Sequence, residues 1–256
     1  MRHLSLFTGA GGGELGAILN GWHTIGYVEF NDYCQRVLKA RIEDGILPEA
    51  PIFGDIKTFI SDGYASSYQG LVDVISGGFP CQPFSVAGKQ KGADDERNMW
   101  PATIECVRII KPRYCFFENV RGLLGAGTDC DSDEWGVENT ATDSIRYFGT
   151  ILRDLSDCGY AARWKVISAA EVGAPHKRDR LWIMAHSNSL KCRDSQKRST
   201  AIRLPFSLDA QDIRKRGCES PILGDNHGVA DRVDRLKAIG DGQVPSVVRA
   251  AWEILS

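Results

Sequence analysis

The sequence predicts an α/β domain with a mixed, mostly parallel sheet that carries helices on both faces. Short apolar runs alternate with amphipathic runs of helical length, which is the pattern of repeated strand–helix units. The first apolar run is followed at once by a glycine-rich turn, as is common where a strand of such a sheet leads into a helix. The length of 256 residues is enough for one domain of this class with a small appendage.

The expected elements alternate along most of the chain and end with two late strands and a helix. Strands are expected at residues 4–7, 24–28, 71–76, 114–117, 163–168 and 180–185. Helices are expected at about residues 14–20, 32–42, 101–110, 145–155 and 244–255. The strands at 71–76 and 114–117 are apolar nearly throughout, as expected for strands buried on both faces, and Pro101 suits the first turn of its helix. The last helix is amphipathic, so we expect it to pack back on the main domain.

Two stretches interrupt the alternation. Residues 128–143 are acidic and contain no basic residue, so we expect a solvated surface loop there. Residues 187–220 carry more Lys and Arg than Asp and Glu and few apolar positions. They predict either a flexible linker or a small binding module.

Composition narrows the class of protein further. No run approaches the roughly 18 apolar residues of a membrane span, and residues 1–3 lead into a strand without a signal peptide. The eight cysteines form no CxxC pair, so we expect reduced thiols in a cytosol rather than disulfides. Five scattered histidines predict no metal site. Because the net charge is −2, any basic surface for nucleic acid must be local.

Cys81 is the strongest candidate for a nucleophile. It follows the strand at 71–76, and ligands of open α/β sheets bind at such strand ends. Pro80 and Pro83 fix the backbone on both sides of Cys81, so its thiol is held in a rigid loop. A buried structural cysteine is the alternative, because this residue type is usually buried.

The turn at residues 7–13 is a candidate ligand site. Its glycines allow the backbone to approach a ligand closely, although a tight turn without a ligand explains them equally well. Glu14 occupies the position at which a dinucleotide fingerprint has glycine. A pyrophosphate is therefore disfavoured, and so is a nicotinamide oxidoreductase, whereas a ligand with a cationic amino-acid end suits the turn.

Two acidic residues at the ends of later segments extend this candidate site. Glu29 follows the second strand, about 20 residues after the glycine turn, where an acidic side chain can accept hydrogen bonds from ribose hydroxyls. Asp55 could contact an adenine amino group. Each alone is more often a cap or turn residue, but together with the glycine turn they outline a nucleoside pocket.

Glu118, Arg178 and Arg180 are candidates for proton transfer and for charge stabilisation. Glu118 ends an apolar strand, so desolvation should raise the pKa of its carboxyl group toward neutrality. A buried glutamate that only accepts backbone hydrogen bonds is the alternative. Arg178 and Arg180 precede a late strand and could hold a phosphate and a carbonyl oxygen, although ordinary surface charge is the default for such a run.

In this order the motifs resemble those of the DNA (cytosine-5) methyltransferase family. The resemblance covers about residues 4–186 and 231–255. The matching motifs are Phe7-Thr8-Gly9-Ala10-Gly11-Gly12, Glu29-Phe30, Gly54-Asp55-Ile56, Gly78-Phe79-Pro80-Cys81-Gln82-Pro83-Phe84-Ser85, Gly88-Lys89-Gln90, Glu118-Asn119-Val120, His176-Lys177-Arg178-Asp179-Arg180 and Gly240-Asp241-Gly242-Gln243-Val244-Pro245. The family pattern usually has glutamine in place of His176 and asparagine in place of Asp241.

The resemblance implies a Rossmann-like S-adenosylmethionine-dependent methyltransferase fold and methyl transfer to C5 of a flipped-out cytosine. Cys81 would add to C6 of the base, Glu118 would protonate N3, and Arg180 would hold O2, with Arg178 nearer the phosphate backbone. The cofactor is S-adenosylmethionine, which leaves as S-adenosylhomocysteine, and no metal is expected. Cofactor-binding residues would be Phe7, Thr8, Gly9, Gly11, Gly12, Glu29, Phe30, Asp55, Ile56, Pro80, Gln243 and Val244. DNA-binding residues would be Ser85, Lys89, Gln90, Lys91 and Arg97.

The resemblance also implies three parts of the chain and a set of partners. Residues 1–186 would form the catalytic and cofactor-binding domain, residues 187–230 a reduced target recognition segment, and residues 231–256 a C-terminal helix returning to the catalytic domain. The expected protein is a monomer that binds double-stranded DNA in the cytoplasm of a bacterium or phage-infected cell, near the nucleoid. A cognate restriction system or an accessory recognition subunit are open as further partners. Methylation of RNA cytosine and a catalytically weakened DNA-binding relative are the alternatives, the latter because the recognition segment is short.

Overall fold

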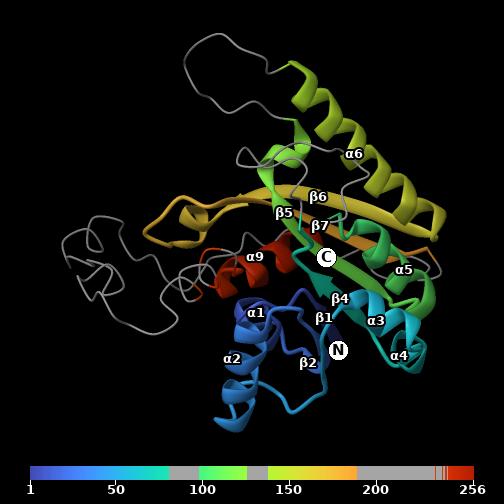
Figure 1. The fold of residues 1–256 in the computed structure, drawn as a ribbon. Coiled ribbons are helices and arrows are strands. Elements are labelled where there is room, and N and C mark those ends of the chain that lie inside the picture. The colour runs from blue at the N-terminus through green and yellow to red at the C-terminus, as the bar shows by residue number, and fades with distance from the viewer. Residues whose placement is uncertain (81–97, 126–137, 189–233, 235–237, 239, 241) are drawn as a thin grey trace.

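The computed structural model describes residues 1–80, 98–125, 138–188, 234, 238, 240 and 242–256 (Figure 1). Within these residues, seven strands form one sheet in the order β3-β2-β1-β4-β5-β7-β6. Strands β3, β2, β1, β4 and β5 run parallel to one another, whereas β7 is antiparallel to both β5 and β6. The predicted α/β fold with a mixed, mostly parallel sheet is confirmed.

The elements largely match those expected from the sequence. The strands are β1 (Arg2–Leu6), β2 (His23–Val28), β3 (Ile52–Phe53), β4 (Val74–Gly77), β5 (Tyr114–Val120), β6 (Tyr160–Ser168) and β7 (Asp179–Ser187). The helices are α1 (Gly12–Leu19), α2 (Asp32–Glu43), α3 (Ile56–Ser61), α4 (Tyr64–Ser67), α5 (Trp100–Ile110), α6 (Glu138–Asp157) and α9 (Pro245–Leu255). The 3-10 turns Arg121–Leu124 and Ala169–Val172 follow β5 and β6. The sequence pattern misses β3, α3 and α4, because elements of two to six residues carry too few positions to show a period.

Helix α6 begins earlier than the sequence pattern predicts. A surface loop is expected over residues 128–143, but the backbone of residues 138–143 belongs to α6, so that part of the prediction is wrong. Acidic composition is favourable in the N-terminal turns of a helix, where it complements the helix dipole. An acidic composition therefore does not distinguish a loop from the start of a helix. The rest of the expected loop, residues 128–137, lies outside the described part of the chain.

Both faces of the sheet are covered by helices (Figure 1). On β5, Cys115 and Phe117 point into the larger core, which α3, α4, α5 and α6 cover. Phe116 points into the opposite core, which it shares with Trp182 of β7 and with α1 and α9. Successive side chains of a strand face opposite ways, so a strand covered on both sides is apolar throughout. This burial explains the continuous apolar runs in the sequence.

The C-terminal helix α9 packs on α1, as its amphipathic pattern predicts. A Cβ atom placed on Gly16 would lie 2.4 Å from Cβ of Val248, so the two helices approach closely at this glycine. Trp252 of α9 meets Trp22 edge-on at 4.6 Å between ring centroids and meets Phe116 at 5.5 Å.

The predicted three-part division of the chain stays a prediction, because residues 189–233 lie outside the described residues.

The parallel strands bring their carboxyl ends to one edge of the sheet. Strands β1, β2, β4 and β5 end there, at Leu6, Val28, Gly77 and Val120. The motifs that follow these strands are therefore neighbours in space, although they lie far apart in the sequence.

No helix in the described residues is long and apolar enough to cross a membrane.

Candidate active site

A cavity of about 810 Å³ opens at this edge of the sheet. Its volume lies within the range of small-molecule sites in proteins, which is roughly 300–1,000 Å³. Ten residues proposed from the sequence line it: Phe7, Gly9, Glu29, Phe30, Asp55, Ile56, Pro80, Glu118, Arg178 and Arg180. Of the other proposed residues, Thr8, Gly11, Gly12, Gln243 and Val244 are not among the lining residues. Cys81, Ser85, Lys89, Gln90, Lys91 and Arg97 lie outside the described residues.

The turn after β1 is held in an unusual backbone conformation. Phe7 has φ 53°, a value that costs a non-glycine residue about 1–2 kcal/mol, and Gly9 and Gly11 also have positive φ. Beneath the turn, Thr8 donates through Oγ1 to Ser5 Oγ at 3.0 Å and to the Val28 carbonyl at 3.3 Å. Thr8 thus supports the cavity wall formed by Phe7 and Gly9 rather than lining it.

Glu29 joins the turns after β1 and β2. Its Oε2 accepts a hydrogen bond from the Gly9 amide at 2.6 Å, and its Oε1 accepts one from the Asn31 amide at 2.7 Å. The side chain is largely buried but still lines the cavity. Glu29 can therefore hold the two turns and also face a ligand, so the two alternatives given from the sequence are compatible.

The adenine-side candidates occupy the far wall of the cavity. Asp55 is the N-cap of α3 and accepts from the Lys57 amide at 2.9 Å. Ile56 is buried beneath it, whereas Phe30 is 77% exposed. An aromatic ring so exposed at a cavity wall offers a flat apolar surface for stacking. This wall combines a carboxylate acceptor with an aromatic face.

A second buried acid lies beneath the glycine turn. Glu14 in the first turn of α1 accepts a short hydrogen bond from Ser5 Oγ, and its Oε2 has no partner among the described residues. Burial is the main reason that the pKa of this carboxyl group is raised to about 7; the negative charge of Glu29 also raises it, against hydrogen bonds that lower it. Sequence reasoning used Glu14 to disfavour a dinucleotide and to favour a ligand with a cationic amino-acid end.

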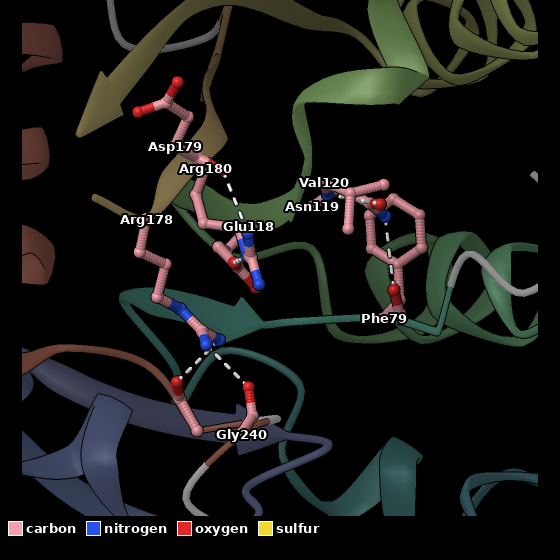
Figure 2. Close-up of polar contacts among 9 residues, drawn as sticks. Phe79, Glu118, Asn119, Val120, Arg178, Asp179, Arg180 and Gly240 are labelled. Atoms are coloured by element: carbon pink, nitrogen blue, oxygen red, sulfur yellow. Dashed lines mark hydrogen bonds and ion pairs between the residues drawn. The ribbon is translucent and has the colours of Figure 1, made fainter. Parts of the chain in front are cut away.

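On the opposite side of the cavity, Glu118 and Arg180 form a partly buried ion pair (Figure 2). The sheet register pairs Glu118 with Trp182 and Val120 with Arg180, so Glu118 and Arg180 are diagonal neighbours on one face. Arg180 Nε lies 2.9 Å from Glu118 Oε1. The sequence places Glu118 at the end of a strand, whereas β5 continues through Val120.

Glu118 has the raised pKa that its apolar strand predicts. Desolvation by burial is the main cause, opposed by the charges of Arg180 and Arg178 and by a hydrogen bond from the Gln243 side chain. A carboxyl group whose pKa is raised holds a proton more readily than an ordinary surface carboxylate does, which suits it to proton transfer.

Arg178 has a different setting from Arg180. Its Nη1 donates to the Gly240 carbonyl at 2.6 Å, and its Nη2 donates to the Gly242 carbonyl at 2.9 Å (Figure 2). The guanidinium therefore ties the segment before α9 to the start of β7. Its role near the phosphate backbone stays a prediction.

Two residues that sequence reasoning left without a role shape the wall around Glu118. Asn119 Nδ2 donates to the Phe79 carbonyl at 3.2 Å and so fixes the turn that leads to Pro80 (Figure 2). A Cβ atom on Gly78 would lie only 2.9 Å from Glu118 Oε2. The sequence could have indicated both residues, because Gly78 belongs to the motif that contains Cys81 and Asn119 belongs to the motif that contains Glu118.

In the described part of the chain, no group of three or more His, Cys, Asp or Glu side chains could hold a metal ion. The cavity is instead walled by backbone turns, carboxylates, two arginines and aromatic rings. These groups suit an organic ligand with hydroxyl, amino and aromatic parts.

Comparison with known proteins identifies the family. The family model for C-5 cytosine-specific DNA methylase matches residues 1–226. The chain is 32% identical over 185 residues to the Type II methyltransferase M.NgoMIV of Neisseria gonorrhoeae, covering 72% of this chain and 51% of that protein. It is 30% identical to M.AquIA of Picosynechococcus sp., covering 72% of this chain and 71% of that protein. For M.HhaI of Haemophilus parahaemolyticus the identity is 30%, over 77% of this chain and 52% of that protein.

Solved structures agree on the fold. A mutant of Spodoptera frugiperda DNMT2 superposes with a TM-score of 0.50 at 21% identity, covering 80% of this chain and 55% of that chain. The S. pombe Dnmt2 methyltransferase superposes with a TM-score of 0.51 at 19% identity, covering 79% and 53%. The chain spans about half the length of M.NgoMIV, of M.HhaI and of both solved structures. On the match of its family model, the chain belongs to the C-5 cytosine-specific DNA methylase family.

Proposed function

We propose that this chain transfers a methyl group from S-adenosylmethionine to C5 of cytosine in DNA. The observation that carries the proposal is the placement of the Glu118–Arg180 ion pair on the wall of a cavity whose other wall is the glycine turn with Glu29. Groups suited to proton transfer and to ligand binding thus line one cavity. The match to the cytosine-specific DNA methylase family supports DNA as the substrate class.

The residues present fit S-adenosylmethionine. Its adenosine has hydroxyl and amino donors, which suit the carboxylates of Glu29 and Asp55, and an aromatic base, which suits the exposed ring of Phe30. Gly9 and Phe7 would contact the amino-acid end, because both line the cavity and a Cβ atom on Gly9 would meet no heavy atom within 4 Å. When bound, the cofactor supplies an electrophilic methyl group on a sulfonium. Thr8, Gly11, Gly12, Pro80 and Val244 are proposed as further cofactor contacts, and of these Pro80 lines the cavity.

The chemistry requires a nucleophile and an acid on the base. C5 of cytosine is a weak nucleophile, and addition of the Cys81 thiolate to C6 would convert the ring into an enamine. C5 of this enamine would take the methyl group as the sulfonium S–CH3 bond breaks and S-adenosylhomocysteine leaves. Glu118 donates a proton to N3 as the thiolate adds, and Arg180 stabilises the charge that develops at O2. A base would then remove the C5 proton, the Cys81 thiolate would leave, and N3 would return its proton to Glu118, which restores the aromatic ring with the methyl group in place.

The DNA contacts belong to segments outside the described residues. Ser85, Lys89, Gln90, Lys91 and Arg97 are proposed to meet the substrate, with lysine and arginine on phosphates. The target base must leave the duplex to reach the cavity, at a cost of a few kcal/mol. Residues 187–230 are proposed to recognise the target, alone or with an accessory subunit, in a monomeric cytoplasmic enzyme that could accompany a restriction system.

Transfer of labelled methyl from S-adenosylmethionine to unmethylated duplex DNA tests the proposal. The wild-type chain and a Cys158→Ala control should label DNA, whereas Cys81→Ala should bind the cofactor and label nothing. Labelling of tRNA but not of DNA in a parallel reaction would change the substrate to RNA. Labelling of neither, with cofactor still bound, would mark a catalytically weakened relative and contradict the proposal.

A further inference from the structure

The side chain of Gln243 lies between the two walls of the active site. Its Oε1 is 2.6 Å from the point that a Cβ atom on Gly13 would occupy, at the start of α1. Its Nε2 is 3.3 Å from the equivalent point on Gly78, at the end of β4. Glu118 Oε2 lies 2.9 Å from that same point on Gly78. The amide nitrogen of Gln243 and the second carboxylate oxygen of Glu118 therefore share the space left by a missing side chain.

Gln243 is a hydrogen-bond partner of Glu118. This hydrogen bond lowers the pKa of Glu118 and so favours the ionised carboxylate, which only accepts; the amide Nε2 of Gln243 is therefore the donor. Arg180 holds the other oxygen, Oε1, at 2.9 Å. A carboxylate with a donor on each side is fixed in rotation as well as in position, and a buried carboxylate without such partners is costly.

The backbone around Gln243 is held in place by the catalytic wall itself. Arg178 donates to the carbonyls of Gly240 and Gly242 on the segment that leads to Gln243. On the other side, a Cβ atom on Gly12 would lie 2.3 Å from the Gln243 carbonyl oxygen, so only glycine allows this approach. The backbone at Gln243 is thus positioned by Gly12 of α1 and by Arg178, the residue before β7.

We propose that Gln243 is a positioning residue that acts through Glu118, holding its carboxyl group in the orientation needed for proton transfer to the target base. This inference rests on the proposed methyl transfer and assigns Gln243 a role different from the cofactor binding implied by the family resemblance. It agrees with the absence of Gln243 from the residues that line the cavity in the described structure.

The contact can be tested without turnover, by following the protonation of Glu118 in the infrared. A Glu118→Gln variant identifies the carboxyl band. Gln243→Met keeps the length of the side chain and removes the donor, and Gln69→Met, at an exposed residue, is the matched control. The charged groups facing Glu118 are Arg180 and Arg178, and both are kept. Because the Gln243 hydrogen bond lowers the pKa of Glu118, Gln243→Met should move the titration of that band to higher pH, and Gln69→Met should not.

Kinetics then separate the two roles of Gln243. A positioning role predicts that Gln243→Met lowers kcat about tenfold, as expected for loss of one charge-assisted hydrogen bond. The Kd for S-adenosylmethionine should stay within about twofold of the wild-type value. Gln243→Glu provides a second variant of the same size, and its added carboxylate should also move the Glu118 titration upward.

The opposite pattern would overturn the inference. A Kd for S-adenosylmethionine raised about tenfold, with the Glu118 band and kcat unchanged, would make Gln243 a cofactor ligand. An unchanged titration in both Gln243→Met and Gln243→Glu would show that no contact reaches Glu118. Failure of the wild-type chain to methylate DNA would contradict the proposed function instead, and the infrared titration would still decide the contact.

Discussion

The two walls of the cavity hold their carboxylates in different ways. On the cofactor side, Glu29 accepts hydrogen bonds from the backbone amides of Gly9 and Asn31, and Asp55 accepts one from its own helix start. On the catalytic side, Glu118 is held by the side chains of Arg180 and Gln243. Backbone amides carry no net charge and cannot titrate, whereas Glu118 has charged neighbours, and its pKa is raised by burial and lowered by Arg180, Arg178 and Gln243.

This difference fits the functions proposed for the two walls, which are cofactor binding and proton transfer. A binding wall needs a fixed shape, and backbone donors supply it. A wall that moves a proton needs a carboxyl group whose charge can change, and burial of Glu118 raises its pKa toward that condition. Substitutions on the two walls should therefore affect different measured quantities.

The largest effect is expected from Glu118→Gln. Without an ionisable group, proton donation to N3 is lost, and the rate of methyl transfer should fall about 10²- to 10⁴-fold. Cofactor affinity should change less than about threefold, because the cofactor wall is untouched. Single-turnover rates and calorimetric titration with S-adenosylmethionine measure the two quantities, with Glu105→Gln, an exposed residue of α5, as the control. An unchanged rate would remove Glu118 from proton transfer.

A smaller effect, of the opposite kind, is expected from Glu29→Ala. Two backbone amides lose their acceptor, so the turns after β1 and β2 should loosen and the Kd for S-adenosylmethionine should rise about 10- to 100-fold. At saturating cofactor the rate should stay within a few-fold of wild type. Equilibrium dialysis against the exposed control Glu49→Ala measures the change. A large loss of kcat without loss of affinity would break the division between the two walls.

The smallest effect concerns Glu14, the buried acid of the cofactor side. Its pKa is raised to about 7 from a usual value of 4.5, so between these pH values the folded state holds a proton that the unfolded chain has lost. Its contribution to stability is therefore lost as pH rises from about 4.5 to about 7. Glu14→Gln removes this titration, and the decline in Tm between pH 5 and pH 8 should shrink by roughly 5 °C.

The control for this prediction is the difference in Tm between wild type and Glu14→Gln at each pH. His3 is buried and its pKa is lowered to about 3, so its contribution to stability changes with pH in the opposite sense. Because His3 is present in both proteins, its effect cancels in the difference between wild type and Glu14→Gln. An equal Tm decline in the two proteins would mean that Glu14 does not titrate in this range.

The strands and the sites at their ends could be predicted because their signals are local. The apolar run before Glu118 marks a buried strand, and desolvation of its carboxyl group follows from that run alone. The glycines at 9 and 11 mark a turn, and both have positive φ. These inferences needed only neighbouring residues.

The contacts between distant segments could not be predicted in the same way. Arg178 was expected near phosphate, yet its donors bind carbonyls that follow it by more than sixty residues, at Gly240 and Gly242. Gln243 was grouped with the cofactor residues, and nothing in its sequence neighbourhood indicates a contact with Glu118. Such pairings depend on how α9 returns to α1, which is a property of the whole fold.

The central claim is that Cys81 attacks C6 of a cytosine in DNA while a methyl group is delivered to C5. Duplex DNA with 5-fluorocytosine tests it most directly. A base can remove the hydrogen at C5 but not a fluorine in its place, so the covalent adduct persists after methyl transfer. Intact-mass measurement should show the wild-type chain bound to the DNA strand, dependent on S-adenosylmethionine, and Cys81→Ala should show no adduct. An adduct formed equally by Cys81→Ala, or none by a wild-type chain that methylates ordinary DNA, would contradict the account.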